Sequence, residues 1–93
     1  MRLTLATVQV ARALLSPAEP RQWLRDISRR AEVESGVAHP ILQRMLGEGW
    51  LEAWREDGRR YYQVTPVGRT ELEGLMVRAH EDPRFKHLFS GER

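Results

Sequence analysis

The feature that most restricts the fold of this chain is a single predicted β-hairpin between residues 50 and 65. Two extended runs, WLEAWR at residues 50–55 and RYYQVT at residues 60–65, flank the dipeptide Asp57-Gly58. Asp-Gly between two such runs is the strongest short-range signal of a hairpin. A lone hairpin is only marginally stable in water, so this one must pack on other elements. The remaining segments have helical periodicity, which makes the chain mostly helical.

Residues 35–46, SGVAHPILQRML, are predicted to form a short helix with two unlike faces. The buried stripe consists of apolar residues at helical spacing: Ala38, Ile41, Leu42, Met45 and Leu46. Ser35 is expected to be the N-cap, because its side-chain oxygen can accept a hydrogen bond from the first turn. Pro40 is expected in the first turn, where a helix needs no backbone donor. The outward face then carries Val37, His39, Pro40, Gln43 and Arg44.

Three further helices are predicted around this one. The first spans residues 4–15, with Thr4 as its cap and Val10 off its apolar stripe, where Val10 is available to a second chain. The second spans residues 21–32 and has Trp23 on its apolar face. The last begins at Thr65-Pro66, an N-cap followed by a proline at the first helical position, and it ends before residue 83. One of the glycines in Gly47-Glu48-Gly49 is expected to close the third helix in the left-handed conformation.

The order of elements is therefore helix, helix, turn, recognition helix, hairpin and C-terminal helix. Two short helices joined by a tight turn that contains glycine form a helix-turn-helix. A hairpin directly after it makes the arrangement a winged helix, an α+β fold that is mostly α, with the wing tip at residues 56–60. The length of 93 residues predicts that this is a single domain spanning the whole chain, 1–93.

Composition excludes several other classes of protein. The chain has no Cys, so it has neither a disulfide framework nor a thiolate metal site. No apolar run approaches the roughly 20 residues of a membrane helix, and we find no signal peptide, so we expect a soluble cytoplasmic protein without a membrane partner. The three histidines, His39, His80 and His87, lack metal-ligand spacing. No nucleophile with a base and no glycine-rich phosphate loop is present, so we expect no enzyme activity, cofactor or metal.

The cations of the chain are almost all arginine. Fourteen Arg stand against a single Lys, Lys86, although the formal net charge is only +2. Arginine forms bidentate contacts with phosphate and with guanine, which favours a nucleic acid as partner. A GC-rich genome would produce the same bias through its codons, so the placement of the arginines matters more than their number.

The outward face of the helix at 35–46 and the wing tip hold the candidate residues for binding double-stranded DNA. Gln43 can pair with adenine and Arg44 with guanine in a major groove, and the alternative for both is a solvated helix face. His39 either reads a base or phosphate or merely caps and packs. Backbone N–H groups at the helix start can approach a phosphate. The full predicted set is Arg25, Ser35, Gly36, Val37, His39, Pro40, Gln43, Arg44, Arg59 and Arg60.

Some of these arginines have competing partners in the sequence. Arg59 and Arg60 are placed in the wing, where such folds meet backbone phosphates or a minor groove. Arg55 faces a similar region, but it could instead pair with Glu52 or Asp57. Arg21, Arg25 and Arg29 lie on the helix that crosses the phosphates in helix-turn-helix proteins, and we expect one of them to contact DNA and the others to form surface ion pairs.

The three tryptophans are expected mainly in the core. Trp23 and Trp50 occupy apolar positions at helical and strand spacing. Trp54 is the exception, because it points outward if Leu51 and Ala53 face the core. Tyr61, on the returning strand, is then expected beside it.

Two segments resemble a known family. HPILQRMLGEGWLE, at residues 39–52, resembles the recognition helix and strand entry of PadR-like transcriptional regulators. GRRYYQVTPVGR, at residues 58–69, is similar to the G-R-R-x-Y-Y-x-L-T-P-x-G-R motif of that family, and Leu72 follows where the family has leucine. The chain departs from the pattern at His39, where the family usually has tyrosine, and at Trp50, where it usually has leucine.

The resemblance implies a homodimeric DNA-binding repressor of the short subtype, which a small molecule or another signal relieves. In that subtype the first and last helices form the dimer. The corresponding residues here are Val8, Ala11, Leu72, Leu75, Met76 and Ala79. An alternative function is a winged-helix protein–protein interaction module without its own DNA specificity. The small net charge and the acids Glu48, Glu52, Glu56 and Asp57 support it, and the charge around the third helix and wing discriminates between the two.

Overall fold

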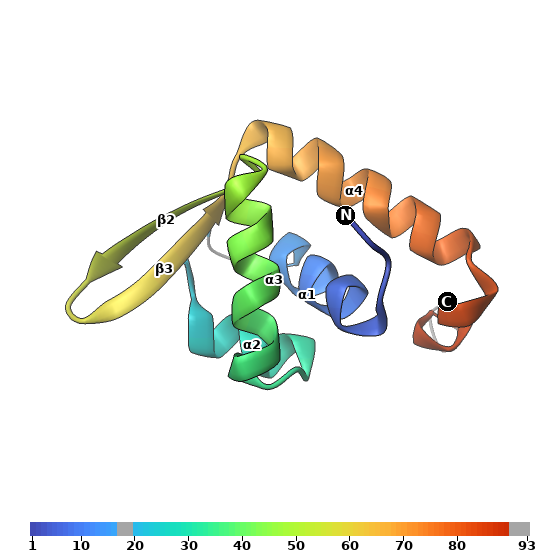
Figure 1. Cartoon of the computed structure of the whole chain (residues 1–93), viewed down its shortest axis with the longest axis horizontal. Coiled ribbons are helices and arrows are strands. Elements are labelled where there is room, and N and C mark those ends of the chain that lie inside the picture. Colours follow the sequence, from blue (N-terminus) through green and yellow to red (C-terminus); the bar gives the residue numbers. More distant parts are fainter. Residues whose placement is uncertain (17–19, 90–93) are drawn as a thin grey trace.

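The computed structural model describes residues 1–16 and 20–89 and has the winged helix-turn-helix arrangement (Figure 1). In chain order the elements are α1 (Leu5–Leu15), β1 (Gln22–Trp23), α2 (Leu24–Ala31), α3 (Ser35–Gly47), β2 (Leu51–Glu56), β3 (Arg59–Val64), α4 (Pro66–Glu81) and the 3₁₀ helix η1 (Pro83–Leu88). The β2–β3 wing projects from one end of the molecule, and α4 runs from the base of the wing to the opposite end. The predicted fold class is confirmed.

The hairpin closes with the turn that its sequence predicts. Asp57 and Gly58 both have positive φ, 54° and 76°, as a two-residue type I′ turn requires. Pairing runs from Leu51 opposite Val64 to Glu56 opposite Arg59. The tight turn brings the two wing arginines, Arg59 and Arg60, to the start of β3.

The sheet has a third strand that periodicity did not predict. Gln22 and Trp23 pair antiparallel with Tyr62 and Tyr61, in the sheet order β1-β3-β2. The prediction of a helix from residue 21 is therefore wrong in its first turn, and α2 begins only at Leu24. The physical reason is that the edge of β3 offers unpaired backbone groups, and pairing with them outweighs a weak local helical preference.

The recognition helix α3 begins differently from the prediction. Its N-cap is Glu34, whose side chain makes no capping hydrogen bond, and Ser35 is the first helical residue. The Ser35 hydroxyl instead donates to the hydroxyl of Ser28 on α2, at 3.4 Å. Pro40 lies inside the helix as its sixth residue, beyond the first turn. The i−4 bond that Pro40 cannot make would have used the carbonyl of Gly36, which lies in an exposed first turn where water can reach it.

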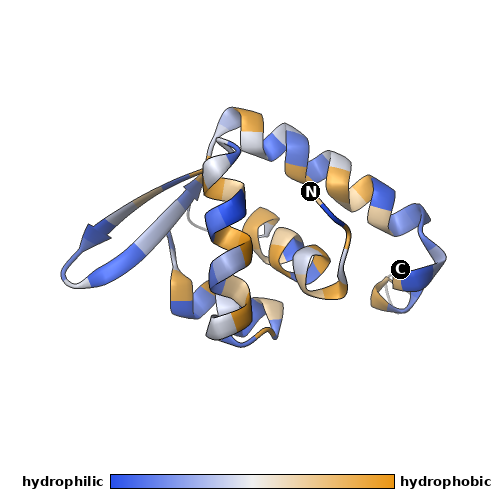
Figure 2. Cartoon of the chain, in the orientation of Figure 1, coloured by the Kyte–Doolittle hydropathy of each residue, from blue (hydrophilic) through white to orange (hydrophobic). Residues whose placement is uncertain are grey.

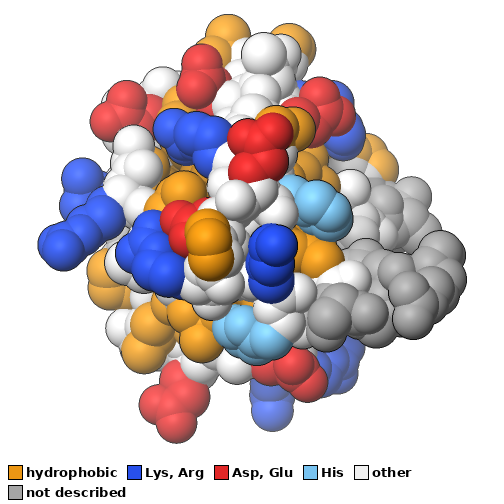
Figure 3. Space-filling view, turned by 90° about the vertical axis from the view of Figure 1, so that its right-hand side faces the viewer, with side chains coloured by type: hydrophobic (Ala, Val, Ile, Leu, Met, Phe, Trp, Pro, Cys, Tyr) orange, Lys and Arg blue, Asp and Glu red, His pale blue; other side chains and the backbone are white. Residues whose placement is uncertain are grey.

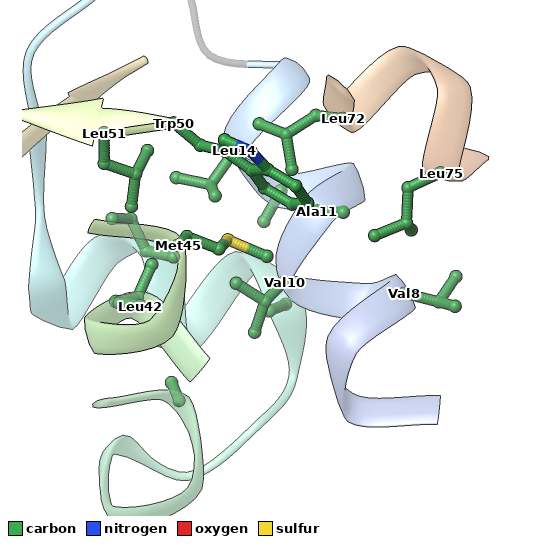
Figure 4. Close-up of a cluster of buried hydrophobic side chains, with 14 of the residues drawn as sticks. Val8, Val10, Ala11, Leu14, Leu42, Met45, Trp50, Leu51, Leu72 and Leu75 are labelled. Carbon is green, nitrogen blue, oxygen red and sulfur yellow. The ribbon is translucent and has the colours of Figure 1, made fainter. Parts of the chain in front are cut away.

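The core fills the space between α1, α3, α4 and the base of the wing (Figure 4). Leu42 and Met45 of α3 lie there without solvent exposure, which confirms the predicted buried stripe. Val10 also has no exposed surface and lies among these side chains. The expectation that Val10 is available to a second chain is therefore wrong, because α1 is covered on more than one side. Figure 2 shows hydrophobic and hydrophilic residues alternating along the helices, as amphipathic helices require.

Most of the residues predicted for dimerisation are part of the same core. Five of them have no exposed surface in the single chain: Val8, Ala11, Leu72, Leu75 and Ala79. Helices α1 and α4 pack against each other within one chain, and these side chains fill that contact. Only Met76 of the predicted set retains partial exposure. The other five cannot touch a second chain without a rearrangement of the core.

The junction between the wing and α4 is confirmed in detail. Thr65 is the N-cap of α4, its hydroxyl accepts from the Gly68 N–H at 2.9 Å, and Pro66 is the first helical residue. The Thr65 hydroxyl also donates to the Gly49 carbonyl at 2.7 Å, and Gly49 has the left-handed φ of 82° predicted for the end of α3. These bonds join the end of α3, the end of the wing and the start of α4. Among the described residues, no helix is long and apolar enough to cross a membrane.

Candidate nucleic-acid interface

A pocket of about 460 Å³ lies between the start of α2, the first half of α3 and the wing tip. It brings together three segments that are far apart in the sequence. Helix α3 contributes Ser35 and His39. The remaining lining residues come from the segment at 23–25 and from the wing: Trp23, Leu24, Arg25, Arg55, Gly58, Arg59 and Arg60.

The pocket is strongly cationic. Four of its lining residues are arginines, and no lining residue within the described part of the chain is an acid. Elsewhere on the molecule arginines have carboxylate partners, as in Arg29–Asp26 at 2.9 Å and Arg84–Asp82 at 2.8 Å. The latter pair lowers the pKa of Asp82 through hydrogen bonds from the Arg84 side chain and backbone. Four guanidinium groups without a carboxylate repel one another, so the pocket favours an anion.

The wing arginines are held in distinct ways. The Arg59 guanidinium lies over the Trp23 ring, 4.3 Å from its centroid, while Arg25 lies 5.9 Å from the same centroid. The Nε of Arg60 donates to the buried Tyr62 hydroxyl at 3.1 Å. The side chain of Arg55 makes no hydrogen bond or ion pair with residues 1–16 or 20–89, so neither Glu52 nor Asp57 is its partner. Arg55 thus lines the pocket without a carboxylate partner among these residues.

The outward face of α3 is exposed along its length. Gln43 and Arg44 are solvent-exposed as predicted, and Val37 is an exposed apolar residue at the start of the helix. His39 is half-buried, and its Nε2 lies 3.3 Å from the amide nitrogen of Gln43, one helical turn away. The Gln43 amide donates to Nε2 in the tautomer that carries its proton on Nδ1. This contact fixes the Gln43 side chain on the face that such folds turn toward a major groove.

One face of the wing also carries a closed network of polar and aromatic groups. Arg21 Nη1 donates to both carboxylate oxygens of Glu56 at 3.0 Å, and the Trp54 indole donates to one of them at 3.2 Å. These bonds, first that of Trp54 and then those of Arg21, lower the pKa of Glu56. Trp54 lies beside Tyr61, with ring centroids 6.1 Å apart, as predicted. The acid at residue 56 is therefore compensated within the chain.

Sequence reasoning missed two contributors to the pocket. Trp23 was expected in the core, but it is only partly buried and forms a wall of the pocket. A usable signal was its position just before a helix and within reach of a strand edge, where β-forming residues can extend a sheet. Arg55 also lines the pocket, although it is outside the predicted DNA-binding set. Its alternation with Trp54 was sufficient to place it on the opposite face of the wing from Glu56.

The opposite end of the molecule differs in character (Figure 3). There, apolar side chains alternate with acidic, basic and histidine side chains, and no single sign of charge dominates the face that Figure 3 shows. A shallow pocket at this end is lined by Arg12, Met76, Val77, His80 and Phe89. Within the described residues, no group of His, Asp and Glu is arranged to hold a metal ion.

The fold matches those of solved DNA-binding proteins. BpsR of Bordetella bronchiseptica, whose DNA binding is regulated by 6-hydroxynicotinic acid, aligns with a TM-score of 0.72 at 18% identity, over 95% of this chain and 70% of that one. Sso10a-2, a DNA-binding protein of Sulfolobus solfataricus, aligns with a TM-score of 0.64 at 22% identity, over 99% and 98%. The MarR family regulator SPO1453 of Silicibacter pomeroyi aligns with a TM-score of 0.63 at 21% identity.

These similarities concern the fold. The alignment with SPO1453 covers 97% of this chain but only 62% of that regulator. No protein-family model matches the chain, and no curated protein matches its sequence. The structural neighbours are winged-helix proteins, several of them MarR regulators, so they support a winged-helix fold but not the PadR-like subtype.

Proposed function

We propose that this protein is a sequence-specific DNA-binding transcriptional regulator. The observation that carries the proposal is the pocket beside α3, where Arg25, Arg55, Arg59 and Arg60 meet without an acid among the described residues. Its position between a recognition helix and a wing is where a duplex would lie if α3 entered the major groove. The DNA-binding activities named for BpsR and Sso10a-2 support the same function.

The residues divide into two roles in this proposal. Gln43 and Arg44, on the exposed face of α3, contact base edges, and His39 orients Gln43 through their hydrogen bond. The pocket arginines, with the backbone at Ser35 and Gly36, contact phosphates and fix the register of the protein on the duplex. Val37 and Pro40 supply apolar contact for a thymine methyl group.

The experiment is a selection of bound fragments from the source genome, followed by titration of one selected duplex at several salt concentrations. Each phosphate that the protein neutralises contributes about −0.9 to the slope of log affinity against log salt, so a pocket that holds at least one phosphate predicts a slope of about −0.9 or steeper per chain. Failure to bind any fragment at low salt, or a slope near zero, would contradict the proposal. The matched controls are Arg69→Gln and Arg84→Gln, because those arginines lie outside the pocket and pair with Glu73 and Asp82.

We also propose that the active form is a homodimeric repressor of the PadR-like type. The motif at residues 58–69 supports the family, and a shared winged-helix fold does not separate PadR-like from MarR regulators. Because the predicted dimer residues are mostly buried, the contact would use exposed apolar residues of the same helices, such as Leu5 and Val77. Two recognition helices would then lie about 34 Å apart on a palindromic site. Light scattering tests the oligomeric state, and a Val77→Asp variant should be monomeric if Val77 lies in the dimer contact. A reporter assay tests repression.

The partners follow from this function. DNA as the ligand favours a cytoplasmic location, with no membrane partner and no catalytic role. An effector, either a small molecule or a protein, would relieve repression, and the 6-hydroxynicotinic acid of BpsR is a precedent in one structural neighbour. Screening for ligands that lower DNA affinity tests this part of the proposal.

The second candidate function, a protein–protein interaction module, is favoured by one observation. Trp54 and Tyr61 form a half-buried aromatic pair on the wing, on the same face as the acid Glu52. Tyrosine and tryptophan are enriched at the energetic centres of protein interfaces. If Trp54→Ala abolished the biological effect while DNA affinity stayed unchanged, this function would replace DNA binding as the main one.

A further inference from the structure

Two arginine–aromatic stacks lie on the sheet, and their geometry is nearly the same. The Arg21 guanidinium lies 4.6 Å from the Tyr61 ring centroid, and the Arg59 guanidinium lies 4.3 Å from that of Trp23. Trp23 and Tyr61 are cross-strand partners, so their side chains lie on the same face of the sheet. The two stacks therefore provide a natural comparison within one molecule.

The stacks differ in what the N–H groups of the guanidinium meet. Stacking uses the π face of the group and leaves its five N–H donors pointing outward in the plane. In the first stack Arg21 donates to both oxygens of Glu56, so the arrangement is satisfied within the chain. In the second, the Arg59 side chain has no hydrogen bond or carboxylate partner among the described residues. Arg59 is thus oriented but still has donors to offer.

The unpaired donors of Arg59 are at the arginine pocket. Arg25, Arg55 and Arg60 line the same cavity, together with the His39 side chain. An anion there would receive hydrogen bonds from several planar groups at once. Phosphate fits this requirement best, because its non-bridging oxygens accept several hydrogen bonds and match the fork of an arginine.

We propose that the pocket is a seat for a single phosphate group and that Trp23 is a positioning residue, which holds the Arg59 guanidinium flat so that its edge meets the phosphate. The inference rests on the proposed function for the source of the phosphate, which is the backbone of the bound duplex. A free phosphate ester has the same chemistry, so the two sources must be separated by experiment.

The energetic reason for the stack is pre-organisation. A free arginine at the end of a wing loses rotamer freedom when it binds, and the indole restricts that freedom before the ligand arrives. Removing the indole should therefore weaken phosphate binding even though the arginine remains. Ordering one such side chain corresponds to about a fivefold change in affinity for each chain bound.

The first experiment is a double-mutant cycle in the full chain, with affinity for a selected duplex measured by fluorescence anisotropy. Trp23→Leu should weaken binding about fivefold when Arg59 is present and should have no effect in the Arg59→Gln background. Trp23→Phe keeps an aromatic platform and should restore most of the affinity. Independent, additive effects of Trp23→Leu and Arg59→Gln would overturn the positioning role.

The first stack, Arg21 on Tyr61, supplies the matched control. Tyr61→Leu removes the platform of Arg21, whose donors are already used by Glu56. This variant should lower the thermal midpoint of unfolding and leave the affinity of the folded protein for the duplex unchanged. A loss of affinity equal to that of Trp23→Leu would mean that stacking on the sheet supports the wing in general rather than Arg59 in particular.

The third measurement separates this inference from the proposed function. Inorganic phosphate is titrated into the isotope-labelled wild-type chain without DNA, and the Arg59 Nε–H and Trp23 indole N–H resonances are followed by NMR. If these resonances shift and saturate but the protein binds no duplex, the pocket is a phosphate site for free phosphate esters, and the DNA-binding function is refuted. Duplex binding with an additive cycle and no phosphate shifts would refute the seat and leave the DNA function intact.

Discussion

Two glycines in α4 should respond in opposite directions to the same substitution, and one of them tests how α4 is joined to the wing. A Cβ at Gly68 would lie 1.9 Å from the carbonyl oxygen of Trp50, and 2.6 and 2.7 Å from its carbonyl carbon and Cα. These are backbone atoms, so they cannot move aside as a flexible side chain would. A Cβ at Gly74, six residues further along α4, would meet nothing within 4 Å.

The expected magnitude for Gly68→Ala follows from what must move. The Trp50 carbonyl accepts from the Thr65 N–H at 3.0 Å, and the Thr65 hydroxyl accepts from the Gly68 N–H at 2.9 Å. Overpacking costs roughly 1–3 kcal/mol and loss of an N-cap about 1 kcal/mol, so the free energy of unfolding should fall by about 3 kcal/mol. For a domain of this size that lowers the thermal midpoint by roughly 12–24 °C.

Gly74→Ala is the control for helix propensity. Alanine in an exposed helix interior should stabilise by about 0.5–1 kcal/mol relative to glycine, which raises the midpoint by a few degrees. Both variants are measured by circular dichroism on heating and by urea titration. If Gly68→Ala were as stable as the wild type, or if both variants shifted in the same direction, the close packing of α4 on Trp50 would be refuted.

Three further predictions concern the site and the core. Arg44→Ala should change the preferred base at one position of the DNA site, whereas Arg59→Ala should weaken binding to all sequences about equally. Identical sequence profiles for the two variants would disprove this division of roles. Val10→Ala should lower the free energy of unfolding by about 2 kcal/mol, whereas Val77→Ala should change it by no more than about 0.5 kcal/mol. Equal effects of the two variants in urea titrations would contradict the burial of Val10. The pKa of Glu56 is lowered from its usual value of 4.5, so the ionised Glu56 carboxylate stabilises the fold fully at neutral pH, and this stabilisation is lost as the pH falls through the pKa of the folded state. Glu56→Gln should therefore lower the thermal midpoint of unfolding at pH 7 but not at the acid end of a pH series.

Local sequence signals determined most of the elements. The hairpin turn depends on Asp57 and Gly58, which adopt positive φ within four consecutive residues of chain. The start of α4 depends on Thr65 and Pro66, and the end of α3 on the glycine at position 49. Each of these features is decided by conformational preferences and hydrogen bonds between near neighbours. The exposed positions of Gln43 and Arg44 followed for the same reason, from helical period alone.

Contacts between distant segments decided what the sequence could not. Trp23 follows helical spacing, yet it is extended because the edge of β3 is available to pair with it. Val10 is off the main stripe of α1, yet it is buried because several elements surround that helix. Helical periodicity identified the predicted dimer residues as apolar positions on α1 and α4. Only the tertiary structure shows that most of them are buried where α1 packs on α4 within the single chain.

The arginine pocket depends both on local sequence signals and on contacts between distant segments. The sequence alone determined that Arg59 and Arg60 lie at the tip of a wing and that α3 presents a polar face, because turn chemistry and periodicity are local. Only the tertiary structure decided that Arg25, Arg55 and Trp23 join them in one cavity without an acid among its described lining residues. The physical reason is that strand pairing, helix packing and ring stacking join segments that are far apart in the sequence, so local patterns cannot show that these segments are neighbours.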